Sequence, residues 1–95
     1  MTTYERAVGI YGKDMQLNVA IEELSELIKE ICKNKRGADN IDNITEELAD
    51  CYIMMAQLEI IFDIKPISLY SWIDEKLARL EERLAERIVE CKQEK

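Results

Sequence analysis

Two stretches of the chain, IEELSEL (residues 21–27) and ITEELAD (residues 44–50), place apolar and acidic residues at the spacing of an α-helix. Leu24 and Leu27 in the first stretch and Ile44 and Leu48 in the second recur three or four residues apart, which is typical of one side of a helix. We therefore predict that both stretches are helical and that some of their acids lie at the edge of an apolar stripe.

The apolar pattern continues beyond both stretches and predicts further helices. Asp14 is the expected N-cap of the helix that contains the first stretch, and Gly37, in a loop over residues 34–40, is the natural position for a positive φ. Pro66 interrupts the pattern later in the chain. The chain is thus predicted to contain four helices, over residues 2–12, 14–34, 42–63 and 67–92.

The last two helices are predicted to carry long apolar stripes. The stripe of the third consists of Ile44, Leu48, Cys51, Met55 and Leu58, and that of the last consists of Ile73, Leu77, Leu80, Leu84, Ile88 and Cys91. Tyr70 and Trp72 are interpreted as core anchors of the last helix. The expected fold is a single all-α domain, residues 1–95, in a compact bundle of about four helices that forms a homo-oligomer.

Composition excludes several classes of function. The 95 residues include no histidine, which removes Ser-His-Asp triads and histidine metal sites, and only 3 glycines, too scattered for a Rossmann motif or a P-loop. A net charge of −7 argues against a nucleic-acid partner. No membrane span or secretion signal is expected, and three cysteines without paired spacing predict buried reduced thiols in a cytoplasmic protein.

The acids of the two opening stretches form pairs. Glu23 and Glu26 are three residues apart, as are Glu47 and Asp50, so each pair lies on one face of its helix. Antiparallel packing can bring the pairs together, and their mutual repulsion would then require a cation, with Mg²⁺ or Mn²⁺ favoured by an all-oxygen site. The alternative is a solvated surface whose glutamates pair with Lys29, Lys33 or Arg36.

The two acidic stretches together resemble the EExxE…ExxD signature of the MazG-like nucleoside triphosphate pyrophosphohydrolases, an all-α superfamily. The resemblance covers roughly residues 8–84 and includes YGKDMQL (residues 11–17) and IMMAQL (residues 53–58). It implies a dimer or tetramer that hydrolyses a nucleoside triphosphate to the monophosphate and pyrophosphate. It also implies that Mg²⁺ is bound by four catalytic acids, which are Glu23, Glu26, Glu47 and Asp50.

The resemblance leaves other roles open. Glu22 and Glu46 are either acids that position the ligands or plain surface charges, and Glu26 or one of these two acids is a candidate general base. Three basic residues of the last helix, Lys76, Arg79 and Arg83, either contact phosphates or form salt bridges to nearby glutamates and Asp74. The cluster of Lys33, Lys35 and Arg36 is interpreted as a solvated loop that could meet phosphates when the site closes.

The resemblance leaves the contacts to the base open. Gln16, Asn18 and Asn43 could each hydrogen-bond a base or ribose. Tyr70 and Trp72, interpreted above as core anchors, could instead stack on the base. The main rival to the enzyme is a non-enzymatic helical interaction module that dimerises through its apolar stripes. A nucleotide-binding regulator with the same fold is a further possibility, whereas a di-iron bundle is disfavoured because it needs histidine.

Overall fold

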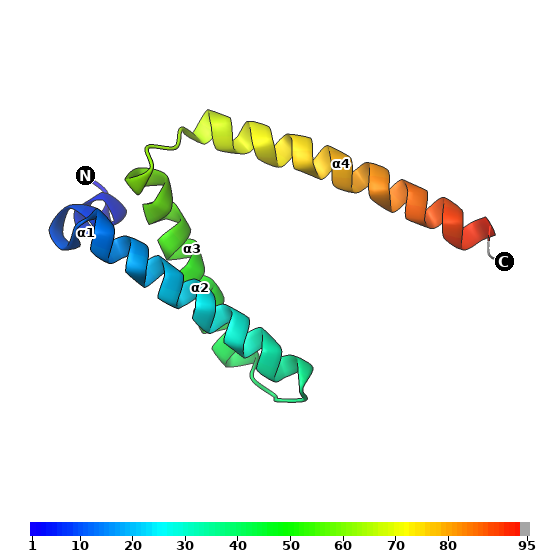
Figure 1. The fold of residues 1–95 in the computed structure, drawn as a ribbon, viewed down its shortest axis with the longest axis horizontal. Coiled ribbons are helices and arrows are strands. Elements are labelled where there is room, and N and C mark those ends of the chain that lie inside the picture. Colours follow the sequence, from blue (N-terminus) through cyan, green and yellow to red (C-terminus); the bar gives the residue numbers. More distant parts are fainter. Residues whose placement is uncertain (94–95) are drawn as a thin grey trace. The chain divides into compact units, whose positions relative to one another are not determined.

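The structure is a computed structural model that describes residues 1–93. In this part of the chain all regular structure is helical: α1 (Thr3–Tyr11), α2 (Lys13–Lys35), α3 (Ile41–Ile61) and α4 (Pro66–Gln93), as Figure 1 shows. The all-α prediction is therefore confirmed, and each helix begins and ends within two residues of its predicted bounds. The chain divides into two compact units, one from Met1 to Asp63 that contains α1–α3, and one from Ile64 onward that contains α4.

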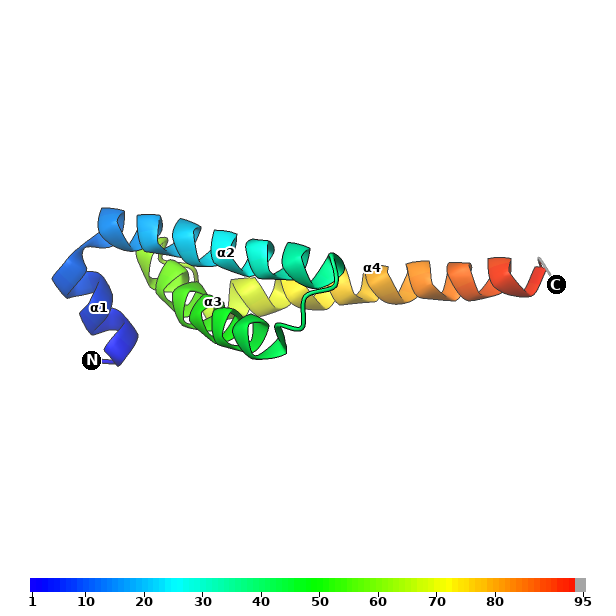
Figure 2. The same cartoon turned by 90° about the horizontal axis from the view of Figure 1, so that it is seen from below.

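Within the first unit, α2 and α3 lie side by side and antiparallel, and α1 packs where α2 begins and α3 ends (Figures 1 and 2). The apolar core of this unit is small and consists of Val8, Ala20, Cys51, Met54 and Ile61. Polar residues are buried among them: Gln16, Glu30, Asn40 and Gln57. The seam between α2 and α3 is therefore partly polar along its length.

Local chemistry fixes the ends of the first two helices. Thr2 caps α1, because its hydroxyl accepts from the Glu5 amide while the Glu5 side chain accepts from the Thr2 amide. Gly12, with φ of 91°, ends α1 and precedes α2 directly. Asp14 is therefore not the N-cap, as predicted, but lies inside the first turn of α2, where a carboxylate still favours the positive end of the helix dipole.

The link between α2 and α3 is a Schellman turn around Gly37, whose φ is 101°. The Gly37 amide donates to the carbonyl of Asn34, and the Ala38 amide donates to the carbonyl of Lys33. The prediction of a positive φ at Gly37 is confirmed. A helix that ends this sharply can turn back within five residues, which places α3 alongside α2.

The buried face of α3 is rotated from the predicted stripe. Leu48 and Met55, predicted to face the interior, are 44% and 51% exposed, whereas Met54 and Gln57 are buried. At about 100° per residue, the two faces differ by about a quarter turn. The prediction was wrong because it counted apolar residues only, and the face that α3 turns toward α2 carries acids and an amide.

Two further predictions of burial were also wrong. All three cysteines are free, as expected, but only Cys51 is buried, while Cys32 and Cys91 are exposed. Tyr70 and Trp72 are 63% and 57% exposed and are not core anchors of this chain. Within residues 1–93, no helix combines the length and apolar character that crossing a bilayer requires.

Candidate metal centre

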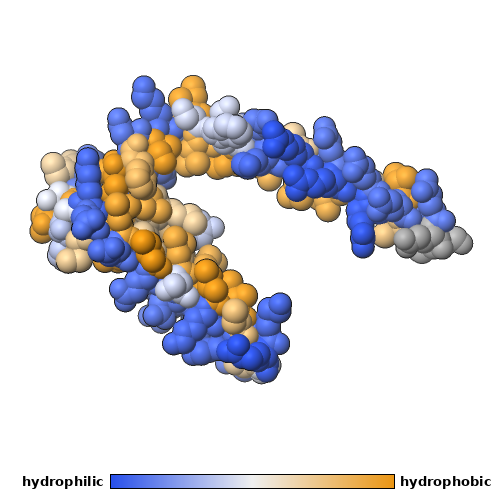
Figure 3. All heavy atoms as spheres, in the orientation of Figure 1, coloured by the Kyte–Doolittle hydropathy of each residue, from blue (hydrophilic) through white to orange (hydrophobic). Residues whose placement is uncertain are grey.

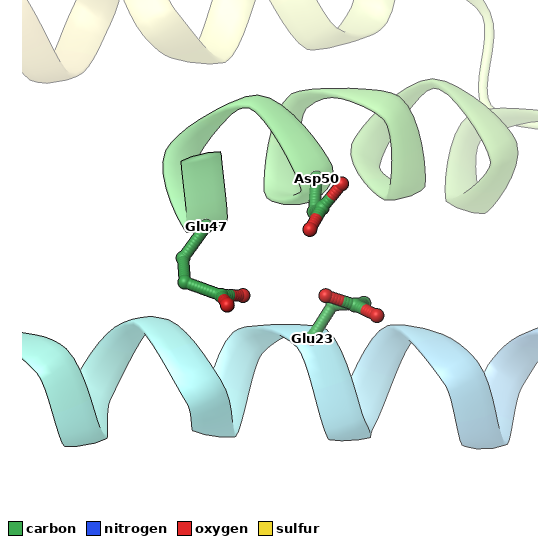
Figure 4. Close-up of side chains that lie close together, drawn as sticks. All are labelled: Glu23, Glu47 and Asp50. Carbon is green, nitrogen blue, oxygen red and sulfur yellow. The ribbon is translucent and has the colours of Figure 1, made fainter. Parts of the chain in front are cut away.

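Three of the four predicted ligands meet at the seam between α2 and α3. Glu23 comes from α2, and Glu47 and Asp50 come from successive turns of α3, with their carboxylates turned toward one another in Figure 4. One oxygen of each carboxylate lies within 4.8 Å of the others. Glu47 and Asp50 share a face because they are three residues apart, and the antiparallel packing supplies Glu23 from the opposite side.

The fourth predicted ligand, Glu26, lies outside this three-carboxylate cluster. It is half-buried one turn after Glu23 on α2, and its charge contributes to the raised pKa of Glu47. Glu22 and Glu46 are exposed, and each contributes charge to the neighbouring cluster member, Glu22 to Glu23 and Glu46 to Glu47. Glu26 is thus adjacent to the cluster, while Glu22 and Glu46 act on it only through their charges.

The cluster is electrostatically uncompensated. Burial raises the pKa of Glu23 above its usual value, and the charges of Asp50 and Glu47 raise it further. Burial is also the largest cause of the raised pKa of Glu47, followed by the charge of Asp50. One oxygen of Glu47, Oε2, is buried and accepts no hydrogen bond from the residues that the structure describes. Such an oxygen lacks a positive or hydrogen-bonding partner.

Cys51 lies beside the cluster, between the two helices. Its side chain is 1% exposed, and its Sγ donates to the Glu23 backbone carbonyl at 3.5 Å. Burial raises the pKa of this thiol, and the charge of Glu23 raises it further, so the thiol keeps the proton that it donates. Cys51 is buried as predicted, and it also contacts the backbone that carries Glu23.

Glu30 is a buried acid that was not predicted from the sequence. Glu30 is 7% exposed, and Lys33 lies 3.4 Å from its Oε2. The charge of Glu30 also acts on the cluster, because it contributes to the raised pKa of Glu47. The available signal was spacing, since Glu30 follows Glu23 by seven residues, close to two full helical turns, and so shares its face.

The basic residues predicted to contact phosphates all lie on α4, in the second unit. The alternative, salt bridging along the helix, is found for one of them, because Arg79 Nη2 donates to Glu75 Oε1 at 2.7 Å in an exposed ion pair. Lys76 Nζ lies 5.9 Å from the centre of the Trp72 ring, a cation–π distance. Arg83 is exposed.

The donor set suits a hard divalent cation. Three half-buried carboxylates offer oxygen atoms only, which is the chemistry that Mg²⁺ and Mn²⁺ prefer, and a cation would both offset their repulsion and provide a partner for Glu47 Oε2. Comparison with known proteins identifies no family for this chain. No family model, curated protein or solved structure matches it.

Proposed function

We propose that the protein is a Mg²⁺-dependent nucleoside triphosphate pyrophosphohydrolase, which releases pyrophosphate and a nucleoside monophosphate. The observation that carries the proposal is the convergence of Glu23, Glu47 and Asp50, together with a buried Glu47 oxygen that accepts no hydrogen bond from the described residues. The motif resemblance supplies the reaction class, because these three acids occupy the EExxE and ExxD positions. Mn²⁺ is an alternative metal with the same preference for oxygen ligands.

The roles of the residues follow from their positions. When bound, Mg²⁺ neutralises phosphate charge and makes bound water more acidic. Glu23, Glu47 and Asp50 would hold the cation. Glu26, which lies beside the cluster without belonging to it, is our proposed acceptor of a proton from the attacking water, with Glu22 and Glu46 as alternatives. Lys76 and Arg83 are the proposed phosphate contacts on α4, and Arg79 would first have to leave Glu75.

The decisive experiment measures pyrophosphate release from a panel of ribonucleoside and deoxyribonucleoside triphosphates, with Mg²⁺ or with EDTA. We expect release only with metal, and a loss of at least about a hundredfold in Glu47→Gln, because removal of a metal ligand removes the charge stabilisation at the phosphate. The matched control is Glu59→Gln, on the same helix but outside the cluster, which should keep wild-type activity. Activity that persists in EDTA or in Glu47→Gln would refute the proposal.

We further propose that the chain forms a homodimer or homotetramer. Large apolar residues remain exposed on α2 and α3, including Ile21, Ile28, Tyr52 and Met55, and apolar side chains gather on the visible surface beside α3 (Figure 3). The apolar stripe of α4, made of Ile73, Leu77, Leu80, Leu84 and Ile88, is at least 40% exposed at every position. Exposed apolar surface of this extent is typical of a protein–protein interface.

The same apolar surface favours one competing function, a non-enzymatic interaction module in which the acids only solvate the surface. Metal distinguishes the two. For the enzyme, Mg²⁺ at about 100 times its dissociation constant should stabilise the fold by about 2.7 kcal/mol. For the interaction module, Mg²⁺ should leave the melting temperature unchanged.

A further inference from the structure

A second feature of the first unit lies along the same seam as the carboxylate cluster, close to α1. It is an open cleft of about 730 Å³, within the size range of small-molecule sites. All three helices of the unit contribute to it, with Tyr4 and Tyr11 from α1, Gln16 from α2 and Gln57 from α3. The cleft thus combines aromatic rings with two amide side chains.

The two amides are buried and joined to each other. Gln16 is 6% exposed and Gln57 is 4% exposed, and Gln16 Nε2 donates to Gln57 Oε1 at 2.7 Å. Gln57 Nε2 in turn donates to the Met54 sulfur at 3.6 Å, a weak acceptor. These two bonds use neither the Gln16 oxygen nor the second N–H of either amide. The pair therefore keeps both donor and acceptor capacity at the wall of the cleft.

The position of the amide pair relative to the cluster is set by helical register. Gln16 precedes Glu23 by seven residues on α2, and Gln57 follows Asp50 by seven residues on the antiparallel α3. Seven residues are about two turns, or about 10 Å along each helix. The amide pair and the carboxylates therefore lie on one continuous seam, and a molecule with its phosphates at the carboxylates can extend its other end toward the amides.

From this geometry we infer that the cleft between α1 and the α2–α3 seam is a nucleobase site, in which Gln16 and Gln57 hydrogen-bond the edge of the base. An amide matches a base edge because both present a donor beside an acceptor. Tyr4 and Tyr11 supply aromatic surface that can lie against the flat base. The inference rests on the proposed function for its ligand class and extends it to base selection.

Base selection provides the first test. Gln16→Met and Gln57→Met keep side-chain length but remove the hydrogen-bonding groups, and Arg6→Met is a matched control at an exposed position on α1 outside the cleft. The quantity to compare is kcat/KM for the deoxynucleoside triphosphates of all four bases. Each glutamine variant should change the ratio between the best and the poorest base by at least about tenfold, and the control should not. An equal loss for every base in a folded variant would overturn the inference.

Binding to the wild-type protein provides a second test that does not depend on catalysis or on the folding of a variant. Deoxynucleoside monophosphates at millimolar concentration, with EDTA present, should shift the side-chain amide NMR signals of Gln16 and Gln57. No shift with any of the four would overturn the base site even if the protein releases pyrophosphate. A clear shift in a protein that hydrolyses no triphosphate would support the base site and refute the proposed reaction instead.

Discussion

At the scale of single residues, the carboxylates at the α2–α3 seam make the metal-free protein sensitive to pH. The pKa of Glu23 and that of Glu47 are both raised in the folded state. A raised pKa means that the folded protein binds the proton more tightly than the unfolded chain does. Protonation of these two carboxyl groups therefore stabilises the fold fully below the unfolded pKa of about 4.3. This contribution to the free energy of unfolding is lost as the pH rises through the higher folded pKa.

We predict that Glu47→Gln becomes more stable relative to wild type as the pH rises from about 4 to about 7 without metal, because a neutral amide removes one repelling charge. Urea unfolding in EDTA across this range measures the difference. The free energy of unfolding of the control, Glu59→Gln, should change with pH in the same way as that of the wild type. If the curves of Glu47→Gln and wild type also stay parallel, the charges of the cluster do not repel one another in the folded state.

At the scale of helices, the register between α2 and α3 depends on the turn that joins them. Asn40 is 8% exposed, and its Nδ2 donates to the Glu30 backbone carbonyl at 2.9 Å, while its Oδ1 accepts from Asn34 Nδ2 at 3.2 Å. These bonds tie the start of α3 to the last turns of α2. The same register brings Asp50 opposite Glu23 and Gln57 opposite Gln16.

We predict that Asn40→Ala lowers the free energy of unfolding by about 1–3 kcal/mol, since it removes two hydrogen bonds to α2, one of them the buried bond to the Glu30 carbonyl. Chemical denaturation measures the loss. Asn43→Ala, at an exposed position in the first turn of α3, is the control and should change stability by less than about 0.5 kcal/mol. A similarly small loss in Asn40→Ala would show that the turn is held by its backbone hydrogen bonds alone.

At the scale of the whole molecule, the apolar surface exceeds what a small core buries. α4 is 28 residues long, whereas α2 has 23 and α3 has 21. α4 is thus longer than either of these helices by more than one helical turn. An amphipathic helix gains most of its stability by packing its apolar face. A second copy of the chain offers a partner of matching length, which is the basis of the proposed homo-oligomer.

Sedimentation equilibrium at micromolar concentration tests the oligomer. We predict a dimer or tetramer for the wild type and a lower mass for Leu80→Glu, because a charge in the middle of the α4 stripe would be buried without a partner. Glu82→Gln, which changes an exposed acid on the same helix, should keep the wild-type mass. A monomeric wild type would contradict the homo-oligomer and the interaction module alike.

Local sequence features are enough to predict the number, order and approximate bounds of the helices. These depend on local properties: periodic apolar residues, a positive φ at Gly37, and Pro66 at the first position of α4. The sequence also singled out the acids of the candidate site, because spacing along one helix is enough to pair Glu47 with Asp50.

The contacts between residues of different helices, in contrast, depend on how the helices pack. The buried face of α3 lies about a quarter turn from its apolar stripe. Glu23 belongs to the three-carboxylate cluster, whereas Glu26 does not. Gln16 hydrogen-bonds Gln57, which is 41 residues away in the sequence. Periodicity cannot supply these contacts, because the face that a helix buries depends on its partner. Here the partner helix presents amides and carboxylates, so the buried seam is polar where the hydrophobic pattern predicted an apolar one.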